Sequence, residues 1–194
     1  MTKYQLWIVA GPNGSGKSTL VAKYLPIFKD RIELINPDNI ARELAEDPRY
    51  PSLAVQLQAG KEVLLKQKSM LENKQSFIIE TTFSGKHEIN LQKQAQELGY
   101  KTNLVFIGIN NVLGNINRVE TRVQQGGHFV SVEDITRRYT RSFENLKNNY
   151  QNFDRAFIFD NSYKTNILKL SLEDNNIKFQ AKDLPNWVVN SISL

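Results

Sequence analysis

The sequence predicts an α/β fold in which helices flank a mostly parallel β-sheet. Short apolar segments alternate with longer segments of helical pattern along the 194 residues. Apolar strands joined through helices are typical of a parallel sheet that is covered on both faces. A glycine-rich segment also stands between the first predicted strand and the first predicted helix. No linker or repeat interrupts this pattern, so we expect a single domain over residues 1–194.

Five strands are predicted where apolar residues end at turn residues, over 4–10, 32–35, 76–80, 103–109 and 156–160. Helical patterns occupy the segments between them, over 17–24, 37–45, 54–72, 86–98, 112–124 and 132–150. Right-handed crossovers place the carboxyl ends of parallel strands at one edge of the sheet, where such sheets bind ligands. We therefore expect the functional residues at this edge.

The pattern changes after Asn161. Residues 167–172 and 177–181 predict two strands, and the polar residues 173–176 between them predict the turn of a hairpin. A short helix is predicted near 186–192. We expect the hairpin to extend one edge of the sheet, within a C-terminal edge element over about 163–194.

Composition and charge limit the classes of function. The chain has 25 Lys and Arg against 20 Asp and Glu, a net charge of +5, and no cysteine. It can therefore form no disulfide, thiol nucleophile or cysteine-bound zinc. Its apolar segments are too short to span a bilayer and no secretion signal precedes the first strand, so we expect a cytoplasmic protein. The mild positive charge permits a nucleic-acid partner, but no stripe of aromatic and basic residues favours one.

The glycine-rich segment matches the phosphate-binding pattern G-x-x-x-x-G-K-[ST]. Its glycines let the backbone curl with N–H groups pointing at an anion, and the following helix adds its N-terminus. Lys17 is expected to reach the β- and γ-phosphates, and the Ser18 hydroxyl to bind Mg²⁺. With the strand–helix alternation, the motif predicts a P-loop NTPase or kinase fold. The ATP site would consist of Gly11, Pro12, Asn13, Gly14, Ser15, Gly16, Lys17, Ser18 and Thr19.

Polar residues for an acceptor site are expected at the same edge. Asp38 follows the second strand at the start of a helix, where it either stabilises the helix dipole or acts as a general base. Glu80 ends the third strand, and the hydroxyl groups of Thr82 and Ser84 follow it. Glu80 would either bind Mg²⁺ through a water molecule or bind a hydroxyl group of the substrate. The alternative is a structural role, in a turn that local side-chain hydrogen bonds stabilise. Asp160, also at a strand end, is more typical of a structural turn or a contact near the adenine.

Two predicted helices carry arginines that suit a bound polyphosphate. No acid stands three or four residues from Arg118 or Arg122, so phosphate would relieve the repulsion between them. Arg138 and Arg141 rank next, because acids on their own helix offer them partners. Two glycines precede His128 between the helices, so we predict that residues 112–142 form a lid over the nucleotide. His128 would either contact phosphate or pack within the lid.

Four segments together resemble the zeta-toxin family, and particularly its short bacterial ATPase or kinase branch. They are residues 11–19, 36–39, 79–85 and 118–142, and the resemblance extends from about residue 3 to residue 162. It implies a P-loop kinase fold that uses ATP and Mg²⁺. It also implies transfer of phosphate to the 3′-hydroxyl of the amino sugar in UDP-N-acetylglucosamine, and a small antitoxin protein as a candidate partner.

Carried over by position, the resemblance implies roles for five residues. Lys17 would bind phosphate and Ser18 would bind magnesium. Asp38 would be the base that acts on the acceptor hydroxyl. Glu80 and Thr82 stand where the family contacts its sugar-nucleotide substrate.

The arginines match the family pattern less completely. Arg118 aligns with a phosphate-binding arginine of the lid. The spacing after it differs from the toxins, so the second lid arginine stays open between Arg122 and Arg138. Ser84 stands where the toxins have a substrate-binding arginine, which weakens the case for UDP-N-acetylglucosamine as the particular acceptor.

Three hypotheses for function follow. The first is a kinase that phosphorylates a small-molecule hydroxyl. The second is a kinase that acts on a nucleotide, a dinucleotide cofactor or a polynucleotide end. The third is an ATP-hydrolysing switch regulated by a protein partner, in which Glu80 would orient water. Dependence of ATP turnover on an acceptor separates the first two from the third.

Overall fold

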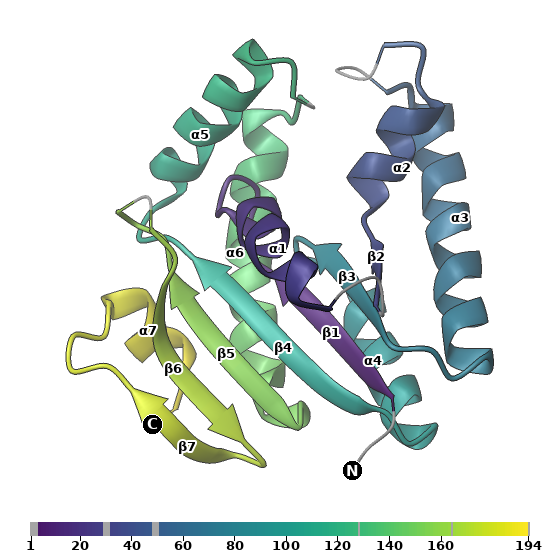
Figure 1. Cartoon of the computed structure of the whole chain (residues 1–194). Helices are drawn as coiled ribbons and strands as arrows, with labels where there is room; N and C mark the ends of the chain where they lie inside the picture. Colours follow the sequence, from purple (N-terminus) through teal and green to yellow (C-terminus); the bar gives the residue numbers. More distant parts are fainter. Residues whose placement is uncertain (1–3, 29–31, 48–50, 128, 164, 194) are drawn as a thin grey trace.

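A seven-stranded sheet with the order β2-β3-β1-β4-β5-β6-β7 forms the centre of the computed structural model, which describes residues 4–28, 32–47, 51–127, 129–163 and 165–193 (Figure 1). The first five strands pair in parallel, and β6 and β7 form an antiparallel hairpin beside β5. This arrangement confirms the mostly parallel sheet and the added hairpin. The strands are β1 (Gln5–Ala10), β2 (Glu33–Ile35), β3 (Phe77–Thr81), β4 (Lys101–Gly108), β5 (Arg155–Asp160), β6 (Ile167–Glu173) and β7 (Asn176–Gln180).

The helices also lie where the sequence predicts them. Four of them begin at a residue whose side chain accepts a backbone N–H of the first turn: Asn36, Ser52, Asn111 and Ser131. Such caps satisfy N–H groups that have no partner within the helix. Two short 3-10 helices, η1 (Leu25–Phe28) and η2 (Tyr150–Asn152), are additional to the prediction. The α-helices are α1 (Lys17–Tyr24), α2 (Pro37–Leu44), α3 (Leu53–Glu72), α4 (His87–Glu97), α5 (Val112–Gln124), α6 (Val132–Asn149) and α7 (Asn186–Ser191).

The two faces of the sheet are covered unequally. The larger apolar core joins one face to residues from α3, α4, α6 and α7, including Leu71, Leu91, Leu146 and Val188. The second core joins the other face to α1, which lies alone in front of the sheet in Figure 1. Both faces carry helices, as expected, but most of the helices lie on one side.

The carboxyl ends of the parallel strands meet at one edge of the sheet. Because β1 lies between β3 and β4, the loop after β1 is flanked by the segments that follow those two strands. Helices α5 and α6 extend beyond this edge on one side and α2 on the other (Figure 1). Among the described residues, none of the helices combines the length and the apolar character that crossing a bilayer requires.

Candidate functional site

The glycine-rich loop folds between β1 and α1, as the sequence predicts. Gly11 and Gly16 have φ angles of 140° and 96°, in the range that favours glycine. A Cβ atom on Gly11 would lie 2.2 Å from the carbonyl oxygen of Ile107, and one on Gly16 would lie 2.3 Å from Nδ2 of Asn161. Both positions therefore require glycine, for backbone conformation and for space.

Two buried asparagines from distant segments hold this loop. Asn115 of α5 donates a hydrogen bond from Nδ2 to the carbonyl oxygen of Asn13. Asn161, directly after β5, donates from Nδ2 to the carbonyl oxygen of Ser15 over 2.8 Å. These bonds use carbonyl groups of the loop, so they shape it without competing with an anion for its N–H groups.

The Lys17 side chain is buried against the loop. Its ammonium group donates to the carbonyl oxygens of Gly11 at 2.8 Å and Pro12 at 3.0 Å. Burial lowers the pKa of Lys17, and the carboxylates of Glu80 and Asp38 act in the opposite direction. The lysine therefore lies between the glycine-rich loop and the two carboxylates that the sequence singled out.

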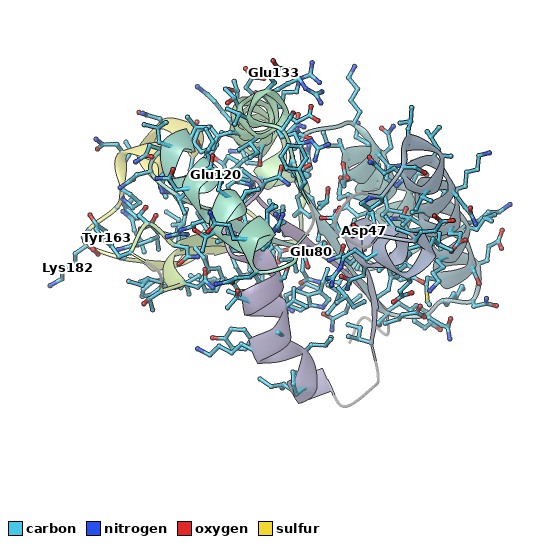
Figure 2. The ribbon with its side chains drawn as sticks, turned by 90° about the horizontal axis from the view of Figure 1, so that it is seen from above. Asp47, Glu80, Glu120, Glu133, Tyr163 and Lys182 are labelled. Atoms are coloured by element: carbon cyan, nitrogen blue, oxygen red, sulfur yellow. The ribbon has the colours of Figure 1, made fainter. Side chains whose placement is uncertain are left out.

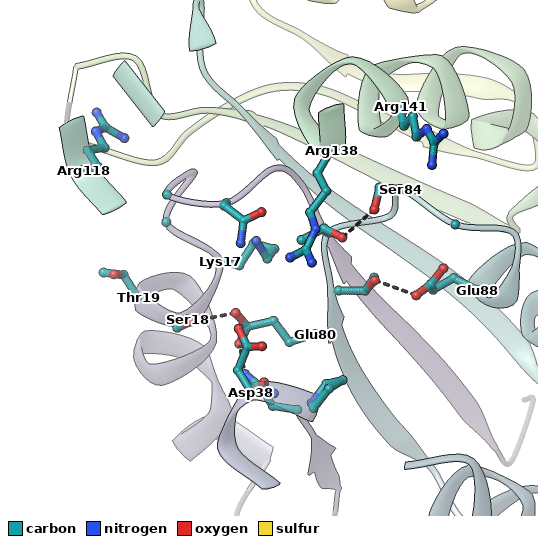
Figure 3. Close-up of a pocket in the computed structure, with 18 of the residues that line it drawn as sticks. Lys17, Ser18, Thr19, Asp38, Glu80, Ser84, Glu88, Arg118, Arg138 and Arg141 are labelled. Carbon is teal, nitrogen blue, oxygen red and sulfur yellow. Dashed lines mark hydrogen bonds between the residues drawn. The ribbon is translucent and has the colours of Figure 1, made fainter. Parts of the chain in front are cut away.

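Glu80 connects the phosphate-binding loop to the start of α2. The Ser18 hydroxyl donates to Glu80 Oε1 over 2.6 Å, and Asn36 Nδ2 donates to Glu80 Oε2 over 2.9 Å. Asn36 in turn accepts the backbone N–H of Asp38 at 2.9 Å through Oδ1. Hydrogen bonds of Glu80 thus join α1 to the start of α2, and Asp38 lies beside Glu80 (Figure 3).

The donor set suits a magnesium ion that is shared with phosphate. Ser18 and Glu80 bring a hydroxyl and a carboxylate oxygen together beside the loop. No cluster of three His, Cys, Asp or Glu side chains that could hold a metal occurs among the described residues. Mg²⁺ commonly takes one or two protein ligands and completes its shell with phosphate oxygens and water. The residues present therefore fit Mg²⁺ bound together with ATP.

The arginines of α5 and α6 occupy different parts of the cavity. Arg118 donates from Nη2 to the carbonyl oxygen of Asn161 over 2.8 Å and points away from Lys17 (Figure 3). Arg138 points toward Lys17. After burial, which is the largest cause, Arg122 and Arg138 also lower the pKa of Lys17. Arg141 has no hydrogen bond or ion pair with any other described residue.

A single cavity of about 850 Å³ brings most of the predicted residues together. Glu80 is one of them and lies near the middle of the molecule in the view from above, whereas Glu120 and Glu133 do not line the cavity (Figure 2). Gly11, Pro12 and Ser15 complete the loop without lining the cavity. The predicted residues that line it are Asn13, Gly14, Gly16, Lys17, Ser18, Thr19, Asp38, Glu80, Thr82, Ser84, Arg118, Arg122, Arg138 and Arg141.

Three other residues have different positions. Asp160 accepts hydrogen bonds from the Ser162 hydroxyl and the Trp187 indole, so it has the structural role that its position at a strand end indicated. His87, which the sequence did not single out, lines the cavity, and its Nε2 lies 2.7 Å from Gln67 Oε1. His128 lies outside the described residues.

The comparison with protein families agrees with this geometry. The model of the family described as "Zeta toxin" matches residues 3–173. The chain belongs to the zeta toxin family. An uncharacterized protein of Haemophilus influenzae (strain ATCC 51907 / DSM 11121 / KW20 / Rd) is 33% identical over 147 residues, which cover 72% of this chain and 100% of that protein.

Solved structures show the same fold as this zeta toxin family member. The AvrRxo1-ORF1:-ORF2 complex with ATP superposes with a TM-score of 0.70 at 14% identity, covering 90% of this chain and 60% of that one. The PezAT toxin–antitoxin system of Streptococcus pneumoniae superposes with a TM-score of 0.61 at 17% identity, covering 97% and 77%. The chain thus spans about three fifths of the AvrRxo1-ORF1:-ORF2 chain that it matches.

Sequence reasoning missed the amides that support the zeta toxin site. Asn36, Asn115 and Asn161 each bond to a residue of the site or its loop, and Glu88 and Arg137 also line the cavity. Asn36 was visible within a family segment. The other amides act on backbone carbonyl groups of distant segments, and such contacts leave no local pattern in a sequence.

Proposed function

We propose that the chain is an ATP- and Mg²⁺-dependent phosphotransferase that moves the γ-phosphate of ATP to a hydroxyl of a small-molecule acceptor. The observation that carries this proposal is the hydrogen-bonded row from Ser18 through Glu80 to Asn36, which joins the phosphate-binding loop to the base candidate Asp38 in one cavity. Membership of the zeta toxin family supports the reaction type. The ATP in the AvrRxo1-ORF1:-ORF2 structure supports the choice of nucleotide.

In the proposed mechanism the loop binds the phosphates of ATP, and Lys17 and Arg138 offset the charge that develops on the transferred group. Asp38 accepts the proton of the acceptor hydroxyl as its oxygen bonds to the γ-phosphorus. The bond from the γ-phosphorus to the β–γ bridging oxygen breaks in the same step, and ADP leaves. Arg118 and Arg122 act as further contacts to ATP.

Ser18 and Glu80 are the proposed protein contacts of Mg²⁺, the first directly and the second through water. When bound, the ion neutralises phosphate charge. Asn36 holds the Glu80 carboxylate in place from the other side. Removal of Mg²⁺ by a chelator should therefore stop transfer.

The first acceptor to consider is UDP-N-acetylglucosamine or a related sugar nucleotide, with Asp38, Glu80, Thr82 and Ser84 around it. All four side chains line the cavity, which supports a shared acceptor site. The serine at position 84, in place of the arginine of the toxins, favours a relative of that substrate. A small antitoxin protein is the proposed partner, and the toxin–antitoxin nature of PezAT supports it.

The test is incubation of the protein with Mg·ATP and a panel of acceptors, with products read by mass spectrometry. The panel contains UDP-sugars, NAD, nucleosides and oligonucleotides. We expect one class of acceptor to gain a phosphate. Asp38→Asn should leave ATP binding intact and lower transfer by ~10²–10⁴-fold, the usual scale for loss of a general base.

Lys17→Ala serves as the control that loses ATP binding itself. Undiminished transfer by Asp38→Asn would contradict the assignment of the base. If ADP forms at the same rate whatever acceptor is added, the hydrolytic switch replaces the kinase. A product only on nucleotides, NAD or oligonucleotide ends would instead select the second class of acceptor.

A further inference from the structure

Polar and apolar side chains alternate in the loop between β3 and α4. Thr82 and Ser84 line the cavity, and their hydroxyl oxygens lie 2.9 Å apart. Phe83 between them is fully buried and its ring packs against Phe153 at a centroid distance of 6.4 Å. The loop therefore presents two hydroxyl groups to a ligand while its middle residue anchors it in the core.

This anchoring requires an unusual backbone conformation. Phe83 has a φ angle of 57°, in the left-handed region that bulky residues rarely adopt. A residue in such a conformation keeps it only where the surroundings fix it, and such residues concentrate at functional sites. The contacts that fix Phe83 therefore decide where Thr82 and Ser84 lie.

One set of contacts comes from the loop and the helix that follows it. The backbone N–H of Phe83 donates to Thr81 Oγ1 over 3.0 Å. The Thr81 hydroxyl donates to Glu88 Oε1 over 2.6 Å. These bonds hold the N-terminal side of the turn against the start of α4.

The second set comes from Asn145 on α6. Its Nδ2 group donates one hydrogen bond to the carbonyl oxygen of Phe83 and another to that of Gly85, each over 2.9 Å. A side-chain amide nitrogen has two hydrogen atoms to donate, and here both are used on one loop. Asn145 therefore clamps the C-terminal side of the turn.

Helix α6 is itself fixed to the sheet, which makes it a suitable support. Leu146 is fully buried, and the Phe143 ring contacts Phe106 at 5.4 Å and Trp187 at 5.3 Å between centroids. The same helix carries Arg141 one turn before Asn145, and Arg141 also lines the cavity, on the side of Ser84 (Figure 3). Through Asn145, the loop that carries the Thr82 and Ser84 hydroxyl groups is therefore fixed to the helix that carries the arginines.

We propose that Asn145 is a positioning residue for the acceptor: it holds the 82–85 loop in its strained conformation, so that Thr82 and Ser84 meet the acceptor at a fixed distance from the arginines of α6. This inference rests on the proposed function for its kinetic consequence. Asn145 has no contact with the phosphate-binding loop among its hydrogen bonds, so the clamp acts on the acceptor and not on ATP.

The first test measures the loop directly and needs no acceptor. Hydrogen–deuterium exchange of residues 82–86 is compared in the unmodified protein, Asn145→Ala and Asn149→Ala. Asn149 is a matched control, because it stands one turn further along α6 and its Nδ2 bonds to the helix itself, at Asn145 O over 2.9 Å. We expect faster exchange of the loop in Asn145→Ala alone; equal exchange in the three proteins would overturn the proposal. Asn145→Ser provides a second variant if the alanine protein does not fold.

The second test measures transfer to UDP-N-acetylglucosamine at varied concentrations of each substrate. Asn145→Ala should raise the acceptor KM or lower kcat ~10- to 100-fold, the scale of small misplacements of substrate-binding groups. The KM for ATP should not change. An equal rise in both KM values would contradict a role specific to the acceptor. If the unmodified protein transfers nothing to this probe, the proposed acceptor is wrong and the exchange result alone decides the clamp.

Discussion

Arg118 and Arg138 differ in their surroundings, although both were candidates for binding phosphate. Arg118 is tied to the segment after β5 through its bond to Asn161 O. Among the described residues, Arg138 has a single ion pair, with Asp134 at 3.8 Å, and its guanidinium points toward Lys17 (Figure 3). We infer that Arg138, which is weakly held beside Lys17, is placed for the charge that develops during phosphate transfer. Arg118, which is bonded to the segment after β5, is better placed for a bound nucleotide.

We therefore expect Arg138→Ala to lower kcat by ~10²–10³-fold, the effect of removing one group that stabilises transition-state charge. The KM for ATP should change little. Arg118→Ala should instead weaken ATP binding more than it lowers kcat. Steady-state kinetics of both variants at varied ATP concentrations check this difference. If Arg138→Ala mainly raised the KM for ATP and Arg118→Ala mainly lowered kcat, the second lid arginine would be another residue.

Most of the candidate residues in the cavity could be predicted from the sequence, but most of the residues that support them could not. Lys17 and Ser18 follow from a spacing that the phosphate chemistry requires. Glu80 was proposed because an acid ended an apolar strand, and it lies in the same cavity. Asn145 gave no such signal, since its partners Phe83 and Gly85 are about sixty residues away in the chain.

At the scale of elements, Glu173 of β6 joins three neighbouring strands. It accepts hydrogen bonds from Lys101 of β4 and Arg155 of β5, each over 2.8 Å. These two bonds lower the pKa of Glu173 from 4.5 to about 2, the bond from Lys101 being the largest cause. The C-terminal hairpin is thus held to the parallel sheet by these charged side-chain hydrogen bonds as well as by backbone hydrogen bonds.

The pKa of Glu173 is lower in the folded chain than in the unfolded chain, so its contribution to stability is present above about pH 4.5 and is lost as the pH falls toward 2. We expect Glu173→Gln to lower the melting temperature at pH 7 and to flatten its dependence on pH in this window. Glu120→Gln, on the outer surface of α5, is the control (Figure 2). Parallel melting curves of the unmodified protein and Glu173→Gln across the window would rule the contribution out.

The elements themselves were largely predictable because local chemistry specifies them. The hairpin turn contains Asp174 and Asn175, which adopt φ angles of 50° and 60°, and these residue types tolerate that conformation. The unequal coverage of the sheet was not predictable. A pattern of apolar residues shows that a helix packs on a sheet, but not which face it chooses.

At the scale of the whole molecule, α7 closes the larger core beside the site. Trp187 is 7% exposed, its ring packs against Phe106 and Phe143, and its indole N–H donates to Asp160 over 3.0 Å. A Cβ atom on Gly108 would lie 2.7 Å from the ring, so the sheet and the tryptophan fit closely. The C-terminal helix is therefore part of the core rather than an appendage.

We expect Trp187→Ala to lower the free energy of unfolding by ~3–5 kcal/mol, as other large-to-small core changes do. Trp187→Phe should have a smaller effect, because it keeps most of the ring. Val189→Ala, at a residue 55% exposed on the same helix, should have almost none. Chemical denaturation of the three variants checks this order, and a loss from Trp187→Ala no larger than that from Val189→Ala would place α7 outside the core.

We expect the two asparagines that hold the glycine-rich loop to determine when a newly made chain can first bind ATP. Asn115 and Asn161 stand 102 and 146 residues along the chain from the carbonyl groups that they hold. During synthesis the loop emerges first, and the residues that shape it follow much later. We expect a ribosome-bound chain that ends before Asn161 to retain no ATP. The proposed phosphate-transferring site would then stay inactive until Asn161 has been made.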